Sequence, residues 1–457
     1  MAKQNAAYHT SLSERMSYGL YFVGQLIFFT LISGFLQLYM TEIGIPATTV
    51  GIVFFIVKIW DAVNDPMFGV IVDKAHMKSG RYIPWVRLST FLIPAATILL
   101  FAVPVNVSVQ VKTIWIAVGY ILWDTSYTIC DVPIFALVTS MTDNIAERDW
   151  LYLLNRFFMF IGGVIVIVAI PLMYPNIGWT LSVVIISVFA MATMLPVGYK
   201  AKERFHTEND KNPSMRELAS YLVHNKPLLV FNLAVIVSAL TNTGGAVGNY
   251  VAIYCLGGPQ WISVMGLVAL LPALVAVVVV QKMLKAIDKR TIFLVFSAVS
   301  YLLGVVLYFA GYQNVVLYFS IAAVRAFLSS GAGILVVVFT ADCSEYGNFK
   351  TGARAQGVAF SIQTFSAKIT GALSTAIGMT LLGIFGFVEG TGAVQTERTI
   401  GWIWSMSTIF PLISGTVALL IILFFYKLRG KDVAVMMRVN TGEITAEEAR
   451  GLFSRPY

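Results

Sequence analysis

Twelve apolar stretches separated by polar connections make up most of the chain. Each is long enough to cross a hydrocarbon core of about 30 Å as a helix. The sequence therefore predicts an all-α, polytopic membrane protein with twelve transmembrane helices. The predicted spans are residues 17–40, 47–72, 85–104, 112–138, 151–173, 177–199, 228–256, 261–283, 291–311, 315–340, 355–385 and 400–426.

The composition agrees with a membrane protein and argues against several other classes. The chain is 58% hydrophobic and 12% charged, with a mean hydropathy of +0.79, which is unlike a soluble core. Residues 1–15 are polar and the first apolar run is too long for a cleavable signal peptide. The cysteines and the four histidines show no metal-ligand spacing, so neither a zinc site nor a disulfide framework is indicated; the cysteines are Cys130, Cys255 and Cys343.

The distribution of basic residues predicts the topology. The longest polar connection follows the sixth span, which predicts two pseudo-symmetric six-helix bundles. With both termini in the cytoplasm, the inner segments hold 25 of the 31 Lys and Arg residues, the outer loops two and the spans four. The net charge of +8 thus faces the inner leaflet of the plasma membrane, and no nucleic-acid partner is needed to explain it. The predicted parts are an N-terminal bundle (1–199), a cytoplasmic central loop (200–227), a C-terminal bundle (228–427) and a cytoplasmic tail (428–457).

The two halves carry similar clusters of acids and bases between spans. We expect these clusters in the loops after spans 2, 8, 4 and 10, at residues 73–81, 285–290, 143–148 and 342–354. Paired clusters of this kind suit a two-half transporter whose cytoplasmic ends are latched in one state and released in the other. Such clusters are also common topology signals, so the similarity between the halves is only supporting evidence for a transporter.

The second span carries a dense polar cluster. Asp61, Asn64 and Asp65 are three and four residues apart, so they share one helix face, and Lys58 lies one turn before them. Two carboxylates and an amide in hydrocarbon are costly unless protein groups, water or a cation compensate them. Their oxygens suit a hard monovalent cation. The alternative is a Lys58–Asp61 salt bridge that only fixes helix packing.

The fourth span supplies the remaining intramembrane acids. Asp124, Thr128 and Asp131 form one stripe along the predicted helix. Pro66 directly follows Asp65, and Pro133 lies two residues beyond Asp131, so we expect a helix irregularity that turns backbone carbonyls towards a cavity at both places. Asp124 is at least as well explained by packing, and we assign it no role.

These groups divide into two predicted sites. Asp61, Asn64, Asp65 and Thr128 would hold a cation between spans 2 and 4. A second set would form a hydrogen-bonding cage for a polyhydroxylated solute, since carboxylate and guanidinium groups can each engage two adjacent hydroxyls. Its members are Asp131, Arg156, Gln363, Thr364 and Lys368, with the ring of Phe135 one turn beyond Asp131. For Arg156, Lys368 and Arg325 the alternative is a structural role inside a bundle, and Phe135 has a packing alternative.

Several stretches in both halves resemble the glycoside–pentoside–hexuronide:cation symporters, the melibiose-permease-like group of the major facilitator superfamily. They are Lys-Ile-Trp-Asp-Ala-Val-Asn-Asp-Pro (58–66), Gly-Arg-Tyr-Ile-Pro-Trp (80–85), Tyr-Thr-Ile-Cys-Asp-Val-Pro (127–133), Asn-Arg-Phe-Phe (155–158), Glu-Tyr-Gly (345–347) and Ser-Ile-Gln-Thr-Phe-Ser-Ala-Lys (361–368). The resemblance covers nearly the whole chain. It implies the major facilitator fold, a sodium or related cation at the predicted cation site, and sugar contact at the predicted cage.

Three departures from the family's galactoside carriers indicate a retuned sugar pocket. Those carriers have a Lys-Asp pair after a glycine in the first span, whereas Gly24 is followed here by Gln25 and Leu26, so the sugar contact of that Asp is lost and Gln25 takes a place in the pocket. Phe135 stands where a tryptophan is expected, and residues 336–339 near the end of span 10 contain no tryptophan. A pentoside, a xyloside or a hexuronide therefore fits at least as well as a galactoside.

The sequence predicts a secondary active sugar importer, coupled to inward sodium flow by alternating access. The sugar would bind between the halves, beside the cation. We expect no enzymatic activity and no cofactor, because the chain has no nucleophile, phosphate-loop or metal motif, and we expect a functional monomer in the bilayer. The alternatives are a proton as coupling ion, a lysolipid carrier on the same scaffold, and a non-transporting sugar sensor.

Overall fold

The computed structural model describes residues 8–75, 77, 80–205, 221, 223, 225–351 and 356–454. Twelve helical spans in this part of the chain are long and apolar enough to cross a membrane, which confirms the predicted all-α fold class. They begin and end within a few residues of the predicted positions, except that span 10 continues to Thr351. Most of the predicted central loop, residues 206–220, 222 and 224, lies outside the described residues.

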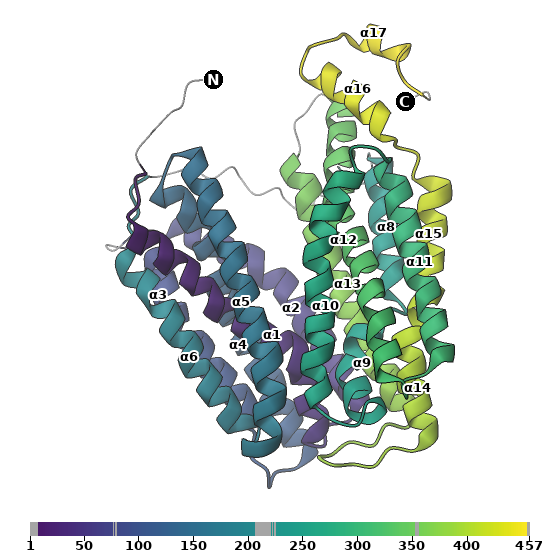
Figure 1. Ribbon diagram of the computed structural model, residues 1–457. Helices are drawn as coiled ribbons and strands as arrows, with labels where there is room; N and C mark the ends of the chain where they lie inside the picture. The colour runs from purple at the N-terminus through teal and green to yellow at the C-terminus, as the bar shows by residue number, and fades with distance from the viewer. Residues whose placement is uncertain are drawn as a thin grey trace. The chain divides into compact units, whose positions relative to one another are not determined.

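The chain divides into two compact units (Figure 1). Unit 1 comprises Met1–Asp210, Gly258–Val264 and Phe387–Val394, and unit 2 comprises Lys211–Gly257, Met265–Gly386 and Gln395–Tyr457. The helices of unit 1 are α1 (Leu12–Glu42), α2 (Ala47–Lys74), α3 (Ile83–Phe101), α4 (Val109–Met141), α5 (Ile145–Ile177) and α6 (Trp179–Lys200).

Unit 2 contains the remaining spans, and two of them are broken. Span 7 consists of α8 (Lys226–Ala239), α9 (Gly244–Tyr250) and a π-helical turn, η1 (Val251–Cys255). Span 12 consists of α14 (Glu397–Thr408) and α15 (Phe410–Phe425). The unbroken spans are α10 (Gln260–Met283), whose first residues belong to unit 1, α11 (Lys289–Ala310), α12 (Val315–Thr351) and α13 (Gln356–Ile384).

Hydroxyl groups hold the two broken spans of unit 2 together. The Thr241 hydroxyl donates to the Phe410 carbonyl at 2.6 Å, and the Thr243 hydroxyl donates to the Met406 carbonyl at 2.7 Å. The Ser414 hydroxyl donates to the Ser238 carbonyl at 2.9 Å. Backbone groups freed at a break inside a membrane need such partners, because no water replaces them there. The breaks therefore face and satisfy one another.

The prediction of helix irregularities at Pro66 and Pro133 is wrong. Both α2 and α4 run without interruption through these positions. A proline removes one backbone hydrogen bond, but packing against neighbouring helices can keep the helix continuous. The expectation that charged clusters occupy loops is also corrected, since Glu147 lies in α5, Asp342 and Glu345 lie in α12, and Lys289 lies in α11.

The first helix is seated in unit 1 by glycines. α1 packs against α5 and α6. A Cβ atom added to Gly24 would lie 2.5 Å from the Ala190 carbonyl oxygen of α6. A Cβ added to Gly162 of α5 would lie 3.1 Å from the Cα of Val23. Only glycine allows such close backbone approach, and close approach is what drives helix association in lipid.

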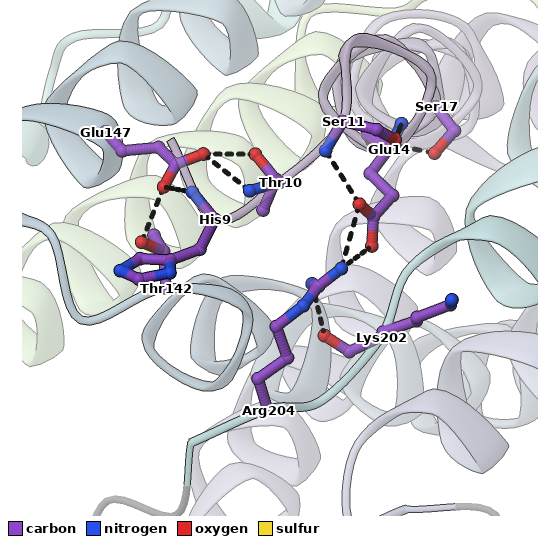
Figure 2. Close-up of polar contacts among 9 residues, drawn as sticks. All are labelled: His9, Thr10, Ser11, Glu14, Ser17, Thr142, Glu147, Lys202 and Arg204. Carbon is purple, nitrogen blue, oxygen red and sulfur yellow. Dashed lines mark hydrogen bonds and ion pairs between the residues drawn. The ribbon is translucent and has the colours of Figure 1, made fainter. Parts of the chain in front are cut away.

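A buried carboxylate ties the N-terminal segment to unit 1 (Figure 2). Glu147 is fully buried. Its carboxylate accepts the backbone N–H groups of His9 and Thr10 at 3.0 Å each, the Thr10 hydroxyl, and the Thr142 hydroxyl at 2.6 Å. Several donors together satisfy a buried charge that would otherwise be expensive. The start of α1 is thereby attached to the α4–α5 connection.

A second carboxylate joins the same helix to the segment after α6 (Figure 2). Glu14 receives Arg204 Nη2 at 2.8 and 3.0 Å on its two oxygens, and it also accepts the Ser11 backbone N–H at 2.8 Å. Ser11 and Glu14 form a capping box that starts α1. The start of α1 is thus linked to the segment that follows α6.

The predicted tail folds against unit 2. It forms α16 (Gly430–Asn440) and α17 (Ala446–Arg450), and α16 packs on α12. The Asn440 side chain donates to the Glu345 carboxylate at 2.8 Å, and the buried Asp432 carboxylate accepts the Ser454 backbone N–H at 2.7 Å. These contacts make the tail part of the unit rather than a loose extension.

We expect the Gly162→Ala substitution to destabilise the protein, whereas Gly163→Ala does not. The new methyl group at position 162 would press on the Val23 backbone, while a Cβ at position 163 meets only Leu26 Cδ2 at 3.4 Å. Overpacking of this kind costs about 1–3 kcal/mol. Thermal melting of the purified protein measures the difference, and equal melting temperatures for the two variants would contradict the close α1–α5 contact.

Candidate cation and sugar sites

A chain of hydrogen bonds joins α2 to α4 in the interior of unit 1. The Asn64 amide donates from Nδ2 to Thr128 Oγ1 at 2.8 Å, and the Thr128 hydroxyl donates to Asp65 Oδ1 at 3.0 Å. Asn64 is 6% exposed and Thr128 is 3% exposed. The structure therefore brings three of the four predicted cation-site residues together. Their side chains offer amide, hydroxyl and carboxylate oxygens, which are the ligands that hard cations prefer.

Asp61, the fourth predicted residue, faces the lysine on its own helix. Lys58 Nζ lies 3.2 Å from Asp61 Oδ2. The salt bridge that the sequence left open as an alternative is therefore present in the structure. It directs the lysine charge at Asp61, whereas Asp65 accepts a neutral hydroxyl. A single lysine balances at most one of the two carboxylates of α2.

Aromatic contacts fix the register of α2 against α4 around this cluster. The Trp60 indole donates to Thr125 Oγ1 at 3.1 Å, and the rings of Phe54 and Tyr120 meet edge to face with centroids 5.1 Å apart. Such pairs are favourable beyond the area that they bury. The Thr128 hydroxyl is held opposite Asn64 and Asp65 by these neighbours as well as by its own bonds.

A second polar pair joins α1 to α4. Gln25 is fully buried, and its Nε2 donates to Asp131 Oδ1 at 2.7 Å. Gln25, which stands where the family's galactoside carriers have a Lys-Asp pair, thus donates an amide hydrogen bond to the predicted sugar-binding carboxylate. The Phe135 ring packs at 5.4 Å from the Phe22 ring and stays 36% exposed. Gln25, Asp131 and Phe135 therefore lie at one region of unit 1.

Arg156, which we predicted to share a cage with Asp131, lies on α5. Its side chain on α5 is exposed and makes no hydrogen bond or ion pair with any residue in the described part of the chain. The alternative of a salt bridge in the bundle interior is therefore not what the described residues show. A guanidinium group with its donors uncommitted can bind a solute.

Sequence reasoning missed two aromatic residues beside Asp131. Tyr127 stacks on Trp123 with centroids 5.0 Å apart and an interplanar angle of 20°. Tyr127 also lies within electrostatic range of Asp131. The spacing of four residues between Trp123, Tyr127 and Asp131 was the available signal, because it puts all three on one helix face. The Trp123 indole is anchored by a 3.0 Å bond to Thr97 Oγ1.

The other predicted sugar-binding residues lie on α13 in unit 2. The Gln363 Oε1 atom is buried and has no hydrogen-bond partner among the described residues. The Thr364 hydroxyl donates back to the Phe360 carbonyl at 3.1 Å, and Lys368 is partly buried. The predicted cage is thus divided, with Asp131 and Arg156 in unit 1 and these three residues in unit 2.

Comparison with known proteins identifies the family. Residues 17–430 match the family described as MFS/sugar transport protein. The chain belongs to this family. The isoprimeverose transporter of Lactiplantibacillus pentosus is 29% identical over 432 residues, covering 91% of this chain and 88% of the relative. A putative sulfoquinovose importer of Salmonella typhimurium is 26% identical over 440 residues, covering 93% and 92%.

Solved structures agree on the fold. The crystal structure of the nucleoside transporter NupG matches with a TM-score of 0.67 at 11% identity, covering 92% of this chain and 100% of that one. At this identity the likeness concerns the major facilitator fold alone. Together with the family match, it confirms the resemblance to the glycoside–pentoside–hexuronide:cation symporters. The chain is a multi-pass membrane sugar symporter of this superfamily and not an enzyme.

We expect Thr128→Val to destabilise the protein and Thr128→Ser to leave its stability close to that of the natural chain. Valine has the shape of threonine but leaves the Asn64 amide and the Asp65 carboxylate without the hydroxyl that joins them. A buried polar group left without its partner costs about 1–3 kcal/mol. Thermal melting in potassium buffer measures the effect. A valine variant that melts like the serine variant would show that the α2–α4 hydrogen bonds contribute nothing.

Proposed function

We propose that this symporter imports a glycoside, pentoside or hexuronide together with sodium, and that the ion binds at Asp61, Asn64, Asp65 and Thr128. The observation that carries the proposal is the Thr128 hydroxyl bonded to Asn64 and Asp65 across two membrane-spanning helices. Intramembrane acids are expensive and usually mark ion or substrate pathways. A sodium ion entering this cluster would take the Asp65 carboxylate and the neighbouring oxygens as ligands.

The pairing of Lys58 with Asp61 bears on how many cations are transported with each sugar molecule. Lys58 pairs with Asp61, and we assign the charge of Asp65 to one monovalent cation. One inward charge at a membrane potential of 100 mV contributes about 2.3 kcal/mol. That corresponds to roughly forty- to fiftyfold accumulation of sugar. Coupling requires that each ligand increase the affinity for the other, typically by about 1–3 kcal/mol.

The sugar contacts of unit 1 are proposed to centre on Asp131. Gln25 orients the Asp131 carboxylate, and carboxylate oxygens accept hydrogen bonds from sugar hydroxyls. The Trp123–Tyr127 stack and Phe135 offer aromatic surface for the apolar face of a sugar ring. Arg156, Gln363, Thr364 and Lys368 are proposed as further contacts. The relatives named for isoprimeverose, sulfoquinovose and lactose support a sugar or glycoside as the substrate.

The proposed orientation has both termini in the cytoplasm. The excess of Lys and Arg in the inner segments, 25 against two in the outer loops, supports it. Import then runs down the sodium gradient and the membrane potential. A functional monomer in the plasma membrane is part of the proposal, since all proposed ligands come from one chain.

A proton is the second candidate for the coupling ion. Asp61 and Asp65 lie one helix turn apart, and two acids near each other can share a proton. Initial rates of uptake in proteoliposomes discriminate the two ions. Sodium coupling predicts rates that rise with external sodium at fixed pH, while proton coupling predicts rates that follow external acidity without regard to sodium.

We expect Asp65→Asn to abolish sodium-driven accumulation of sugar. The substitution keeps the size of the side chain but removes the negative charge that the cation would neutralise. Uptake of a labelled glycoside panel against its gradient, in proteoliposomes with matched protein content, measures this loss. Asp143→Asn is the matched control, because Asp143 is an exposed acid outside the spans that pairs with His9 at 3.0 Å, and it should accumulate sugar normally. Undiminished accumulation by Asp65→Asn would refute the proposed ion site.

A further inference from the structure

Unit 2 contains a cavity that the proposed sugar and cation sites do not use. It has a volume of about 560 Å³ and is lined by residues of α9, α10, α11 and α12 and of the break between α14 and α15. Most of its wall is apolar, with a few polar side chains facing in. These are Asn242, Ser300, Tyr301, Tyr318, Arg325 and Ser329. Volume and lining both match those of small-molecule sites in general, which are concave and largely apolar with few polar groups.

The one cation among the residues lining this cavity is Arg325, from the middle of span 10. Its Nη1 donates to the Ser407 carbonyl at 3.2 Å, next to the break in span 12. The phenols of Tyr301 and Tyr318 lie within electrostatic range of the guanidinium. Within the described part of the chain, no carboxylate pairs with Arg325. The buried acid on the same helix, Asp342 of α12, pairs with Lys289 instead.

A glycine leaves room for this guanidinium. A Cβ atom added to Gly304 of α11 would lie 3.4 Å from Arg325 Cζ and 3.5 Å from its Nη2. The same atom would lie 2.6 Å from the Thr408 carbonyl oxygen. The arginine head is therefore held between α11 and the broken span 12, where the helix ends expose carbonyl groups. One carbonyl occupies one of its five donor hydrogens, and the head still lines the cavity.

An arginine inside a membrane span needs a partner of opposite charge. Burying a cation without one is costly, and ionisable groups within spans usually serve a ligand or an ion path. A guanidinium group binds a carboxylate with two parallel hydrogen bonds. Carboxylate and phosphate are the common anions that fit this geometry best. Two serines, an asparagine and two phenols around the same cavity would serve the hydroxyls of a polyhydroxylated molecule.

We propose that this cavity is a second binding site, and that it takes a carboxylate-bearing solute of about monosaccharide size with the carboxylate on Arg325. The cavity volume accommodates such a molecule, whereas an inorganic monoanion would leave most of it unfilled. The site is built from unit 2 alone, so it does not depend on the cation site in unit 1. It would therefore stand even if sodium coupling failed.

The test uses the purified full-length protein in nanodiscs of zwitterionic lipid, with D-glucuronate as the probe and D-glucose as the neutral match. We expect glucuronate to raise the melting temperature in a saturable way that glucose does not reproduce. Arg325→Gln should weaken glucuronate binding at least tenfold, while Arg325→Lys retains part of it. Arg398→Gln is the matched control, because Arg398 is an exposed arginine of α14 outside the cavity lining, and it should leave this shift unchanged.

A second variant keeps the arginine in place. Ser329 also lines the cavity and lies one turn from Arg325 on the same helix. Ser329→Asp would supply an internal carboxylate, so it should abolish the glucuronate shift and raise the melting temperature of the unliganded protein. The proposal fails if glucuronate gives no shift in the natural chain, or if Arg325→Gln and Ser329→Asp respond as the natural chain does. It also fails if only anionic lipid added to the nanodiscs gives the Arg325-dependent shift, since the occupant is then a lipid headgroup.

Discussion

The hydroxyl of Thr128, bonded to the amide of Asn64 and the carboxylate of Asp65, is the contact on which the account of this transporter depends. It joins two membrane-spanning helices through groups that hydrocarbon disfavours, and it places three oxygen-bearing side chains side by side. Packing alone would be achieved more cheaply by apolar residues, as it is between α1, α5 and α6, where glycines permit close contact. Binding of an ion by these oxygens would explain why polar groups are placed in the membrane interior despite their desolvation cost.

The charged groups of the two units follow different patterns. In unit 1 the intramembrane acids are partnered by neutral donors and one lysine, as with Gln25 on Asp131 and Lys58 on Asp61. In unit 2, Arg325 of span 10 lines a cavity and donates to the Ser407 carbonyl beside the break in span 12. At one end of unit 1, by contrast, Glu147 and Glu14 are each satisfied by several donors and brace the bundle. Buried charge thus has structural and functional uses in one molecule, and the difference lies in what surrounds each group.

Much of this arrangement could be predicted from the sequence, because the bilayer imposes a simple rule on length and hydropathy. The twelve spans, the family, and the closeness of Asn64, Asp65 and Thr128 follow from apolar runs and helical spacing. The breaks in spans 7 and 12 could not be located, because they depend on hydroxyls such as Thr241 and Ser414 meeting across helices far apart in the sequence. The pairing of Lys58 with Asp61 was foreseen only as an alternative, because spacing alone does not say which of two neighbouring acids a lysine chooses. The Gln25–Asp131 hydrogen bond could not be predicted from the sequence, because it depends on how α1 is rotated against α4.

Sodium binding to the purified protein in the absence of sugar is the most direct measurement of the central claim. Calorimetric titration of the natural chain in potassium-based buffer should give one saturable sodium site per chain. The same titration of Asp65→Asn should show none, while Asp143→Asn should match the natural chain. Equal sodium binding by the Asp65 variant and the natural chain would contradict the claim that the polar contact between α2 and α4 holds the coupling ion.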